Sequence, residues 1–408
     1  MSLNKAHKCK SIWAFCPADV LLVVFKQLDI KSLLNCMNVN IYWRNIVVYY
    51  CEHANLWRVM VQNAIDDEGV TFTEKTNLGW REQFLTAQQW FYVSNNMNVN
   101  LRHCYKDSSS IKNIYVHKDN LIVVTNIAVT YFNIANFENI KVIDKSCIRY
   151  EETSSMIVEL SMASEGKVPV LTLTNKLYTN YVDSEKVKKI ILEDIDSFKV
   201  HLDSCYEYSN KVLWMHTAKE IGWETKAMAK YHGIHPFCSL HIFKKNVYIL
   251  LKSGTVLILD TECKMLVNVF HFNIPKLYQK WKPCIFHPYS LLLAAPKSDF
   301  GQYVAVHERK HNHSVTTARY GVTCILQHGY MLILGFVDGK INIYLTIKFM
   351  EPSEADLPEL RLNLKDYLCK TNQSESSLSI TSLDIYEDIT GHHLFVSTTF
   401  NVYELLLL

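Results

Sequence analysis

Seven strand–turn–strand units recur along the second part of the chain, and this repeat limits the fold more than any other feature of the sequence. In the two clearest units, residues 247–260 and 331–345, alternating apolar residues flank the turn pairs Ser253-Gly254 and Asp338-Gly339. A period of two residues interrupted by a tight glycine turn is typical of a β-hairpin. Weaker units occupy residues 121–134, 170–182, 212–225, 291–308 and 393–406. Residues 99–408 are therefore predicted to be all β.

The spacing of these units predicts how they are arranged. Their turns lie about 46 residues apart on average, within the roughly 40 to 50 residues of one propeller blade. The turn positions are Asn126, Asn175, Lys219, Gly254, Gly301, Gly339 and Phe400. We predict a degenerate β-propeller of about seven blades, with an irregular β-sandwich as the alternative. An unpaired strand ending in the leucines at 405–408 would aggregate, so we expect it to pair beside a strand at 98–105 and close the ring.

Residues 12–92 have a different pattern, because their apolar residues recur every three or four positions, as in amphipathic helices. Pro17 suits the first turn of a helix that carries Leu21, Val24, Phe25 and Leu28. A second helix is expected after an N-cap at residue 29, a third at about 41–51, and others at 55–64 and 78–91. The first helix has more apolar side chains than a three-helix unit can cover, so we expect some of them to face a partner.

The composition excludes several classes of partner. The chain has 42 Lys and Arg against 40 Asp and Glu residues, a formal net charge of +2, which argues against binding a nucleic acid by bulk charge. No run reaches the roughly 18 to 20 apolar residues of a membrane span, and the polar start of the chain predicts no secretory signal. The 12 cysteines include no CxxC pair and are expected to be reduced thiols, which indicates the cytoplasm, the nucleus or both.

Catalytic and metal-binding motifs are sparse. The sequence has no GxSxG, phosphate-loop or HExxH motif, so we expect neither an enzyme nor a cofactor, although a catalytic site scattered over several blades stays open. The run His232, His235, Cys238 and His241 has the residue types of a zinc site, but a strand at 237–243 would send Cys238 and His241 to opposite faces, and no metal is predicted. Basic stretches at 186–189 and 276–282 could bind an acidic or phosphorylated substrate or be solvated loops.

Residues 15–58 resemble an F-box. The resemblance is carried, in order, by a proline after an apolar residue, an apolar helix ending at a Leu-Asp step, a Leu-Leu pair with a small residue, and a valine followed by Trp-Arg. These features are Cys16-Pro17, Leu21-Leu22, Phe25, Leu28-Asp29, Leu33-Leu34, Cys36, Val39 and Trp43-Arg44, with Leu56-Trp57-Arg58 downstream. Cys16 and Asn40 depart from the residues usual at their positions in the family.

Residues 322–345 resemble a blade of the WD-repeat family, since 335–344 have the sequence GFVDGKINIY. The Trp-Asp dipeptide and the regular Gly-His pair of that family are missing from the sequence. The hydrogen-bond network that those residues form in the family is therefore expected to be mostly absent.

The two resemblances together imply a substrate-recognition adaptor of a Skp/cullin/F-box ubiquitin ligase, in which the F-box binds a Skp-family linker protein and the propeller binds the substrate. The residues implied to bind the linker protein are Pro17, Leu21, Leu22, Phe25, Leu28, Leu33, Leu34, Val39 and Trp43. The expected domains are an F-box at 12–58, a helical spacer at 59–98 and a propeller at 99–408 with an acidic, Ser-rich insertion at 351–379. The aromatic residues Trp80, Phe84, Trp90 and Phe91 are expected to pack against the first blade. The alternative is a non-degradative interaction scaffold.

Overall fold

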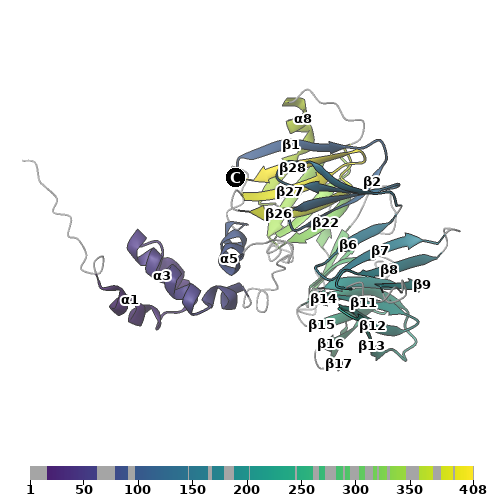
Figure 1. Cartoon of the computed structure of the whole chain (residues 1–408), viewed down its shortest axis with the longest axis horizontal. Coiled ribbons are helices and arrows are strands. Elements are labelled where there is room, and N and C mark those ends of the chain that lie inside the picture. Colours follow the sequence, from purple (N-terminus) through teal and green to yellow (C-terminus); the bar gives the residue numbers. More distant parts are fainter. Residues whose placement is uncertain are drawn as a thin grey trace, which may run out of the picture. The chain divides into compact units, whose positions relative to one another are not determined.

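The computed structural model describes residues 16–61, 79–90, 97–145, 147–163, 168–178, 188–201, 203–243, 246–260, 266–271, 282–287, 290–294, 303–307, 316–318, 321–328, 331–345, 358–370, 378–388 and 391–407. These residues divide into two compact units (Figure 1): a helical unit, 16–61 with 79–85, and a propeller unit, 86–90 with 97–407. The helices of the first unit are α1 (Ala18–Phe25), α2 (Ile30–Cys36), α3 (Ile41–His53), a helical stretch at 56–61, and α5 (Trp80–Gln89), which crosses the division. None of the helices described here is long and apolar enough to cross a bilayer.

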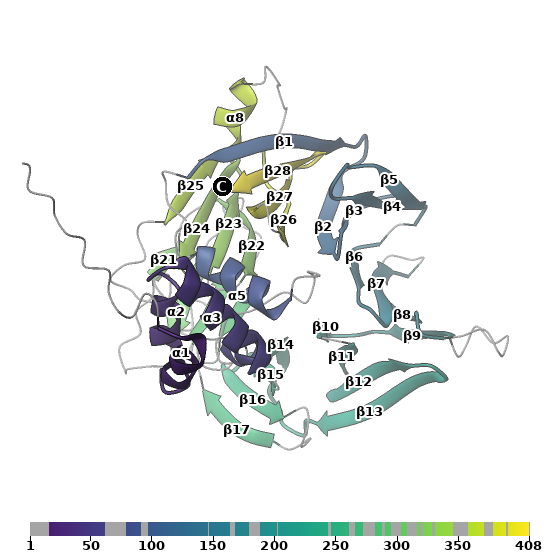
Figure 2. The same ribbon diagram turned by 60° about the vertical axis from the view of Figure 1, so that its left-hand side comes forward.

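The described part of the propeller unit contains seven four-stranded antiparallel sheets, which follow one another around a ring in Figure 2. The first four sheets in chain order are β2 (Ile111–His117) to β5 (Asn139–Ile143), β6 (Arg149–Glu152) to β9 (Lys189–Glu193), β10 (Ser197–His201) to β13 (Gly222–Lys230), and β14 (Phe237–Phe243) to β17 (Leu266–His271). Their middle strands are β3 (Asn120–Thr125), β4 (Val129–Asn133), β7 (Met156–Met162), β8 (Pro169–Asn175), β11 (Ser204–Ser209), β12 (Val212–Lys219), β15 (Asn246–Leu251) and β16 (Thr255–Asp260).

Two further sheets follow in the same order. They are β18 (Lys282–His287), β19 (Ser290–Ala294), β20 (Tyr303–His307) and β21 (Thr316–Ala318), then β22 (Val322–His328), β23 (Met331–Phe336), β24 (Lys340–Leu345) and β25 (Leu360–Asn363). The observed architecture, N-terminal helices followed by four-stranded blades, is the one that the repeat predicts.

The last sheet joins the two ends of the propeller. β1 (Val99–Lys106) pairs with β28 (Asn401–Leu407), which pairs with β27 (Gly391–Ser397) and then β26 (Ser382–Asp388). The C-terminal leucines therefore pair with the strand expected at 98–105, and this prediction is confirmed. Two side-chain hydrogen bonds add to the junction with the next sheet: Val116 N donates to Asp384 Oδ2 (2.6 Å) and Ser382 Oγ to Asn113 Oδ1 (2.6 Å).

Each sheet approaches its neighbours through its innermost strand. Close contacts join β2 to β26 and to β6, β10 to β14, β14 to β18, and β22 to β26. The strands alternate in direction, so the turns after the innermost and the third strands lie on one face of the ring, which we call the inner-turn face. The turns after the second strands and the connections between sheets lie on the other, which we call the connection face.

The alternation of side chains explains why the sheets stack. On β3, Leu121 and Val123 pack in one direction against Phe395 of the preceding sheet, while Ile122 and Val124 pack in the other against Tyr150 of the following sheet. Both faces of a middle strand are thus buried, which is why these strands are nearly continuous apolar runs.

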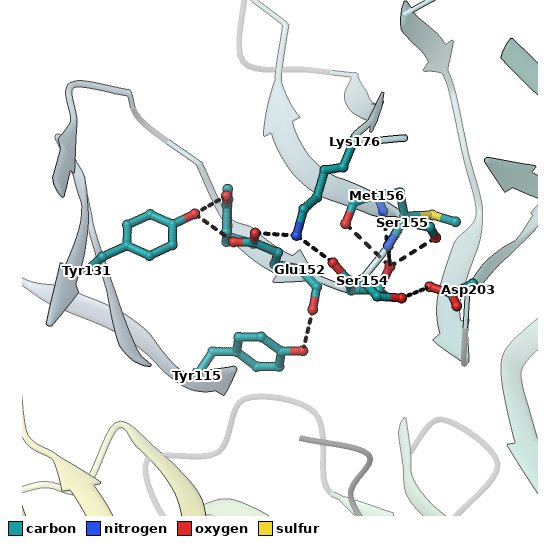
Figure 3. Close-up of polar contacts among 10 residues, drawn as sticks. Tyr115, Tyr131, Glu152, Ser154, Ser155, Met156, Lys176 and Asp203 are labelled. Carbon is teal, nitrogen blue, oxygen red and sulfur yellow. Dashed lines mark hydrogen bonds and ion pairs between the residues drawn. The ribbon is translucent and has the colours of Figure 1, made fainter. Parts of the chain in front are cut away.

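Polar side chains link the β6–β9 sheet to both neighbours on the inner-turn face (Figure 3). Glu152 accepts hydrogen bonds from Tyr131 Oη (2.9 Å) and Lys176 Nζ (2.7 Å), and its backbone carbonyl accepts one from Tyr115 Oη (3.1 Å). On the other side, Ser154 Oγ donates to Asp203 Oδ1 (2.6 Å).

Two of the seven predicted hairpins begin at the third strand of their sheet, whereas the other five begin at the second. The units at 121–134, 247–260, 291–308, 331–345 and 393–406 match second and third strands, whereas 212–225 matches the third and fourth, β12 and β13. The unit at 170–182 likewise begins at a third strand, β8, and its residues 179–182 lie outside the described residues, as does Gly301. The reason is that any two adjacent strands of a buried blade have the same period-two pattern.

The predicted insertion at 351–379 is wrong for its central part. Residues 360–363 form β25, the fourth strand of its sheet, and α8 (Leu364–Lys370) buries Leu364 and Leu368 in the adjoining core. The burial of the apolar residues of this segment explains its place in the sheet, despite its acidic surroundings. Residues 351–357 and 371–377 lie outside the described residues, as do most of the basic stretches at 186–189 and 276–282.

Candidate protein-binding site

The first helix begins after a proline without a side-chain cap, whereas the second and third begin at residues whose side chains accept hydrogen bonds from free backbone N–H groups. Pro17 precedes α1 with an extended backbone, Asp29 Oδ1 accepts a hydrogen bond from Ser32 N (2.7 Å), and Asn40 Oδ1 accepts one from Trp43 N (2.8 Å). The N-cap predicted at residue 29 is confirmed. Asn40, which departs from the F-box pattern, serves here as the N-cap of α3.

The core of this unit forms where α1 and α2 pack on α3. Leu21 and Phe25 of α1 are fully buried, Leu33 of α2 is nearly so, and the ring of Phe25 meets the edge of Trp43 with 5.4 Å between centroids. Val47 of α3 completes the core. Residues i and i+4 of α1 therefore face the partner helices of the same unit.

The opposite side of the same helices leaves apolar side chains exposed. On α1 these are Val20, Val23 and Val24, and Val23 is 63% exposed. At the corner between α2 and α3, Val39 and Ile41 are 57% and 75% exposed. Isolated exposed valines would need no explanation, but an exposed apolar stripe next to an exposed apolar corner is typical of a protein-binding surface.

A hydrogen bond joins the corner to the start of α1. Tyr42 Oη donates to the backbone carbonyl of Cys16 (3.1 Å), which places Tyr42 beside the exposed Pro17. Arg44 Nε also donates to the carbonyl of Met37 (3.1 Å) and holds the α2–α3 turn. We call the exposed set the apolar helical surface: Pro17, Val20, Val23, Val24, Val39, Ile41 and Tyr42.

The residues predicted to bind the linker protein fall into three groups. Pro17 and Val39 are exposed, and Leu22, Leu28, Leu34 and Trp43 are half-buried. Leu21, Phe25 and Leu33 are in the core, so they cannot contact a partner while the helices keep this packing; for these three the prediction is corrected.

The predicted set of linker-binding residues does not include Val20, Val23, Val24, Ile41 or Tyr42. A signal for the first three was present, because Val20, Val23 and Val24 follow the i, i+3, i+4 spacing of a second helical stripe. Two apolar stripes on one helix cannot both be buried in a small unit, but periodicity does not say which of them meets the core.

The aromatic residues after α3 divide between the two units. Trp57 and Phe84 are buried in the helical unit with 5.8 Å between ring centroids, whereas Trp80 is 45% exposed. Trp90 belongs to the propeller unit, and Phe91 lies outside the described residues. The sequence predicted one stripe of these residues packed against the first blade. Instead, Phe84 is buried in the helical unit and Trp90 belongs to the propeller unit.

Trp90 anchors the end of α5 in the propeller unit. Its Nε1 donates to Glu387 Oε1 (2.6 Å), its ring stacks on His392 (4.1 Å between centroids), and His328 Nε2 lies 2.9 Å from the same carboxylate oxygen. Burial alone would raise the pKa of Glu387, but His328 and His392 outweigh it and hold that pKa well below its usual range. The carboxylate is therefore ionised, and its Oε1 atom holds this segment in the propeller unit.

No described site has the chemistry of a metal centre. Within the described residues, no three His, Cys, Asp or Glu side chains are placed so that they could hold a metal ion. In the run singled out from the sequence, His232 and His235 are exposed, and His241 Nε2 lies 2.9 Å from Ser239 Oγ.

Comparisons with known proteins identify the helices. Residues 15–52 match the family model of the F-box domain. No curated protein matches the sequence. Similar solved structures include the computationally designed protein Ika8 (8% identity, TM-score 0.46, covering 75% of this chain and 98% of that one) and the RRP9 WD40 repeats (8%, 0.47, 77% and 100%). A third, U3-55K, is 9% identical with a TM-score of 0.47, covering 76% of this chain and 98% of that one.

Proposed function

From an F-box domain at residues 15–52 joined to a WD-like propeller, we propose that this chain is a non-catalytic substrate-recognition subunit of a cullin-RING ubiquitin ligase. F-box domains generally bind Skp-family linker proteins in such ligases. The observation that supports this role most directly is the apolar helical surface. Its side chains are exposed on the side of the F-box that faces away from the core of the same unit.

The proposed contacts follow from exposure. Val23 and Ile41 are the most exposed apolar residues of this surface, and Pro17 and Val39 are exposed members of the set that the resemblance implied. The half-buried Leu22, Leu28, Leu34 and Trp43 would form the floor of the contact. Burying this apolar surface against a partner would contribute about 25 cal/mol per Å² to the free energy of binding, before the entropic costs of association are subtracted.

The proposed division of labour uses the two units separately. The proposed domains are an F-box at 12–58, a spacer at 59–98, of which residues 86–90 belong to the propeller unit, and a propeller at 99–408. The propeller would hold the substrate while the F-box holds the ligase. An adaptor of this kind forms no covalent bond itself; it raises the effective concentration of the substrate at the ubiquitin-conjugating enzyme.

The test is recovery of a purified Skp-family linker protein by the full-length chain. We expect Val23→Asp and Ile41→Asp to lose most of the linker protein, because a carboxylate would be buried in the contact without a partner. Val142→Asp is the matched control, since Val142 is a half-exposed valine on the propeller. Full recovery by both helical variants would refute the proposed surface.

Substitutions in the core would not test the proposal. Leu21→Asp or Phe25→Asp would place a charge in the buried centre of the F-box and destabilise the unit itself. Ubiquitin transfer by the reconstituted complex distinguishes an adaptor from a non-degradative scaffold, which would bind the linker protein without supporting transfer.

A further inference from the structure

Basic side chains gather on the connection face where the β10–β13 sheet meets the β14–β17 sheet. We call this set the basic patch: Lys211, Lys230, His232, His235 and Lys252. All five are exposed. They come from a hairpin turn, the end of β13, the connection between the two sheets, and the turn after β15.

Backbone hydrogen bonds hold these segments side by side. Tyr231 N donates to the carbonyl of Lys211 (2.8 Å), and Lys252 N donates to the carbonyl of Pro236 (3.0 Å). Lys230 is paired across the sheet with Val212, next to Lys211. The connection at 231–236 therefore lies between the two turns, and the charges share one small area of surface.

The surface under the patch is well packed. The rings of Tyr208 and Phe237 stack with 4.3 Å between centroids, and they adjoin a buried cluster that includes Leu213 and Val247. Ile234 projects from the connection between the basic residues and is 89% exposed. The patch thus combines three lysines and two histidines with one exposed apolar side chain.

The basic patch lacks the carboxylate partners that other lysines of the propeller have, although Lys211 Nζ donates a hydrogen bond to the backbone carbonyl of Gly233 (3.4 Å). Lys176 pairs with Glu152 (2.7 Å), Lys219 with Glu224 (3.3 Å), and Lys340 with Asp338. Among the described residues, no carboxylate forms an ion pair with any of the five side chains of the basic patch. The positive potential here is therefore available to another molecule.

The backbone at Lys211 gives an independent reason to suspect function. Asn210 and Lys211 have φ values of 50° and 64°, so both central residues of the β11–β12 turn are in the left-handed region. Glycine is favoured at the second position of such a turn, and a lysine there is strained. A strained residue whose ammonium group forms no ion pair with a described carboxylate is a candidate for selection on binding.

We propose that the basic patch binds an acidic, extended polypeptide segment of a partner protein, with carboxylates on the lysines and an apolar side chain against Ile234. Lysines are separate point charges that suit carboxylates spread along a chain, whereas one phosphate group is held best by arginine pairs. The near-neutral net charge of the chain disfavours a nucleic acid. The inference rests on the proposed function only in assuming that such a partner is the substrate.

The test is fluorescence anisotropy of a labelled peptide, alternating Glu and Ser around a central Leu, titrated with the full-length chain. We expect binding that weakens as salt is added. Lys211→Gly should weaken it roughly two- to fivefold while leaving the melting temperature unchanged or higher, because glycine relieves the turn. The triple variant Lys211→Gly, Lys230→Gln, Lys252→Gln should weaken it by about tenfold or more.

The control is Lys118→Gly. Lys118 is also an exposed lysine with a positive φ, 52°, but it follows β2 on the inner-turn face. This variant should bind the peptide as the wild type does. Equal binding by the triple variant and the wild type would overturn the proposal, and so would equally tight binding of single-stranded DNA of the same charge, which would indicate a general polyanion site. Val23→Asp should keep full peptide binding, so failure of the linker-protein test and failure of this one are distinguishable.

Discussion

The anchor formed by Trp90 leads to a quantitative prediction about the propeller. Trp90→Phe keeps an aromatic ring against His392 but removes the hydrogen bond of 2.6 Å to the buried Glu387. A hydrogen bond to a charged group contributes about 1.5 to 3 kcal/mol to stability. Because Glu387 keeps His328 as a donor at 2.9 Å, we expect Trp90→Phe to lower the free energy of unfolding by about 1.5 kcal/mol, the lower end of this range. Trp90→Ala also leaves a cavity and should cost about 3 to 5 kcal/mol.

The assay is thermal unfolding of the full-length chain followed by the circular dichroism of the β-sheets. For a unit of this size we expect Trp90→Phe to lower the melting temperature by about 3 °C, and Trp90→Ala by at least twice as much. The exposed Trp80 gives a matched control, and Trp80→Phe should change the stability by less than about 0.5 kcal/mol. If Trp90→Phe has the same melting temperature as the wild type, the Nε1 hydrogen bond does not stabilise the anchor and the reasoning is refuted.

Three further predictions concern the same two units. Asn40→Ala should destabilise the F-box by about 0.5 to 2 kcal/mol through loss of the α3 cap, whereas Asn38→Ala in the preceding turn should not; equal urea midpoints would contradict this. The pKa of Glu387 is lower in the folded chain than in the unfolded one. The ionised side chain therefore contributes to folding stability above the unfolded pKa of about 4.3, and this contribution is lost progressively as the pH falls from about 4.3 toward the folded pKa. Glu387→Gln should therefore be less stable than the wild type at pH 7 and lose less stability between pH 5 and 3 in calorimetry. Deleting residues 401–408 removes β28, the partner of both β1 and β27, and should abolish the cooperative melting of the propeller; an unchanged melt would refute the role of this strand in closing the ring.

Local chemistry made much of the helical unit predictable. The cap at Asp29 and the helix that follows Pro17 depend on residues within one turn of each other, so the sequence alone is sufficient to find them. The repeat of hairpins was predictable for the same reason. The assignment of Leu21 and Phe25 to the interface was wrong because both stripes of α1 are apolar, and only the packing on α3 decides which is buried.

What the sequence determined by itself was the type of each element, the size of the repeating unit and the pairing of the C-terminal leucines, because these follow from periodicity and from the need to cover an apolar edge. Only the tertiary structure decided which side of α1 is exposed, that β25 is the fourth strand of a sheet with α8 packed in the adjoining core, and that Lys211, Lys230 and Lys252 share one surface. The physical reason is that periodicity fixes which residues share a face, whereas contacts between distant segments fix what that face meets.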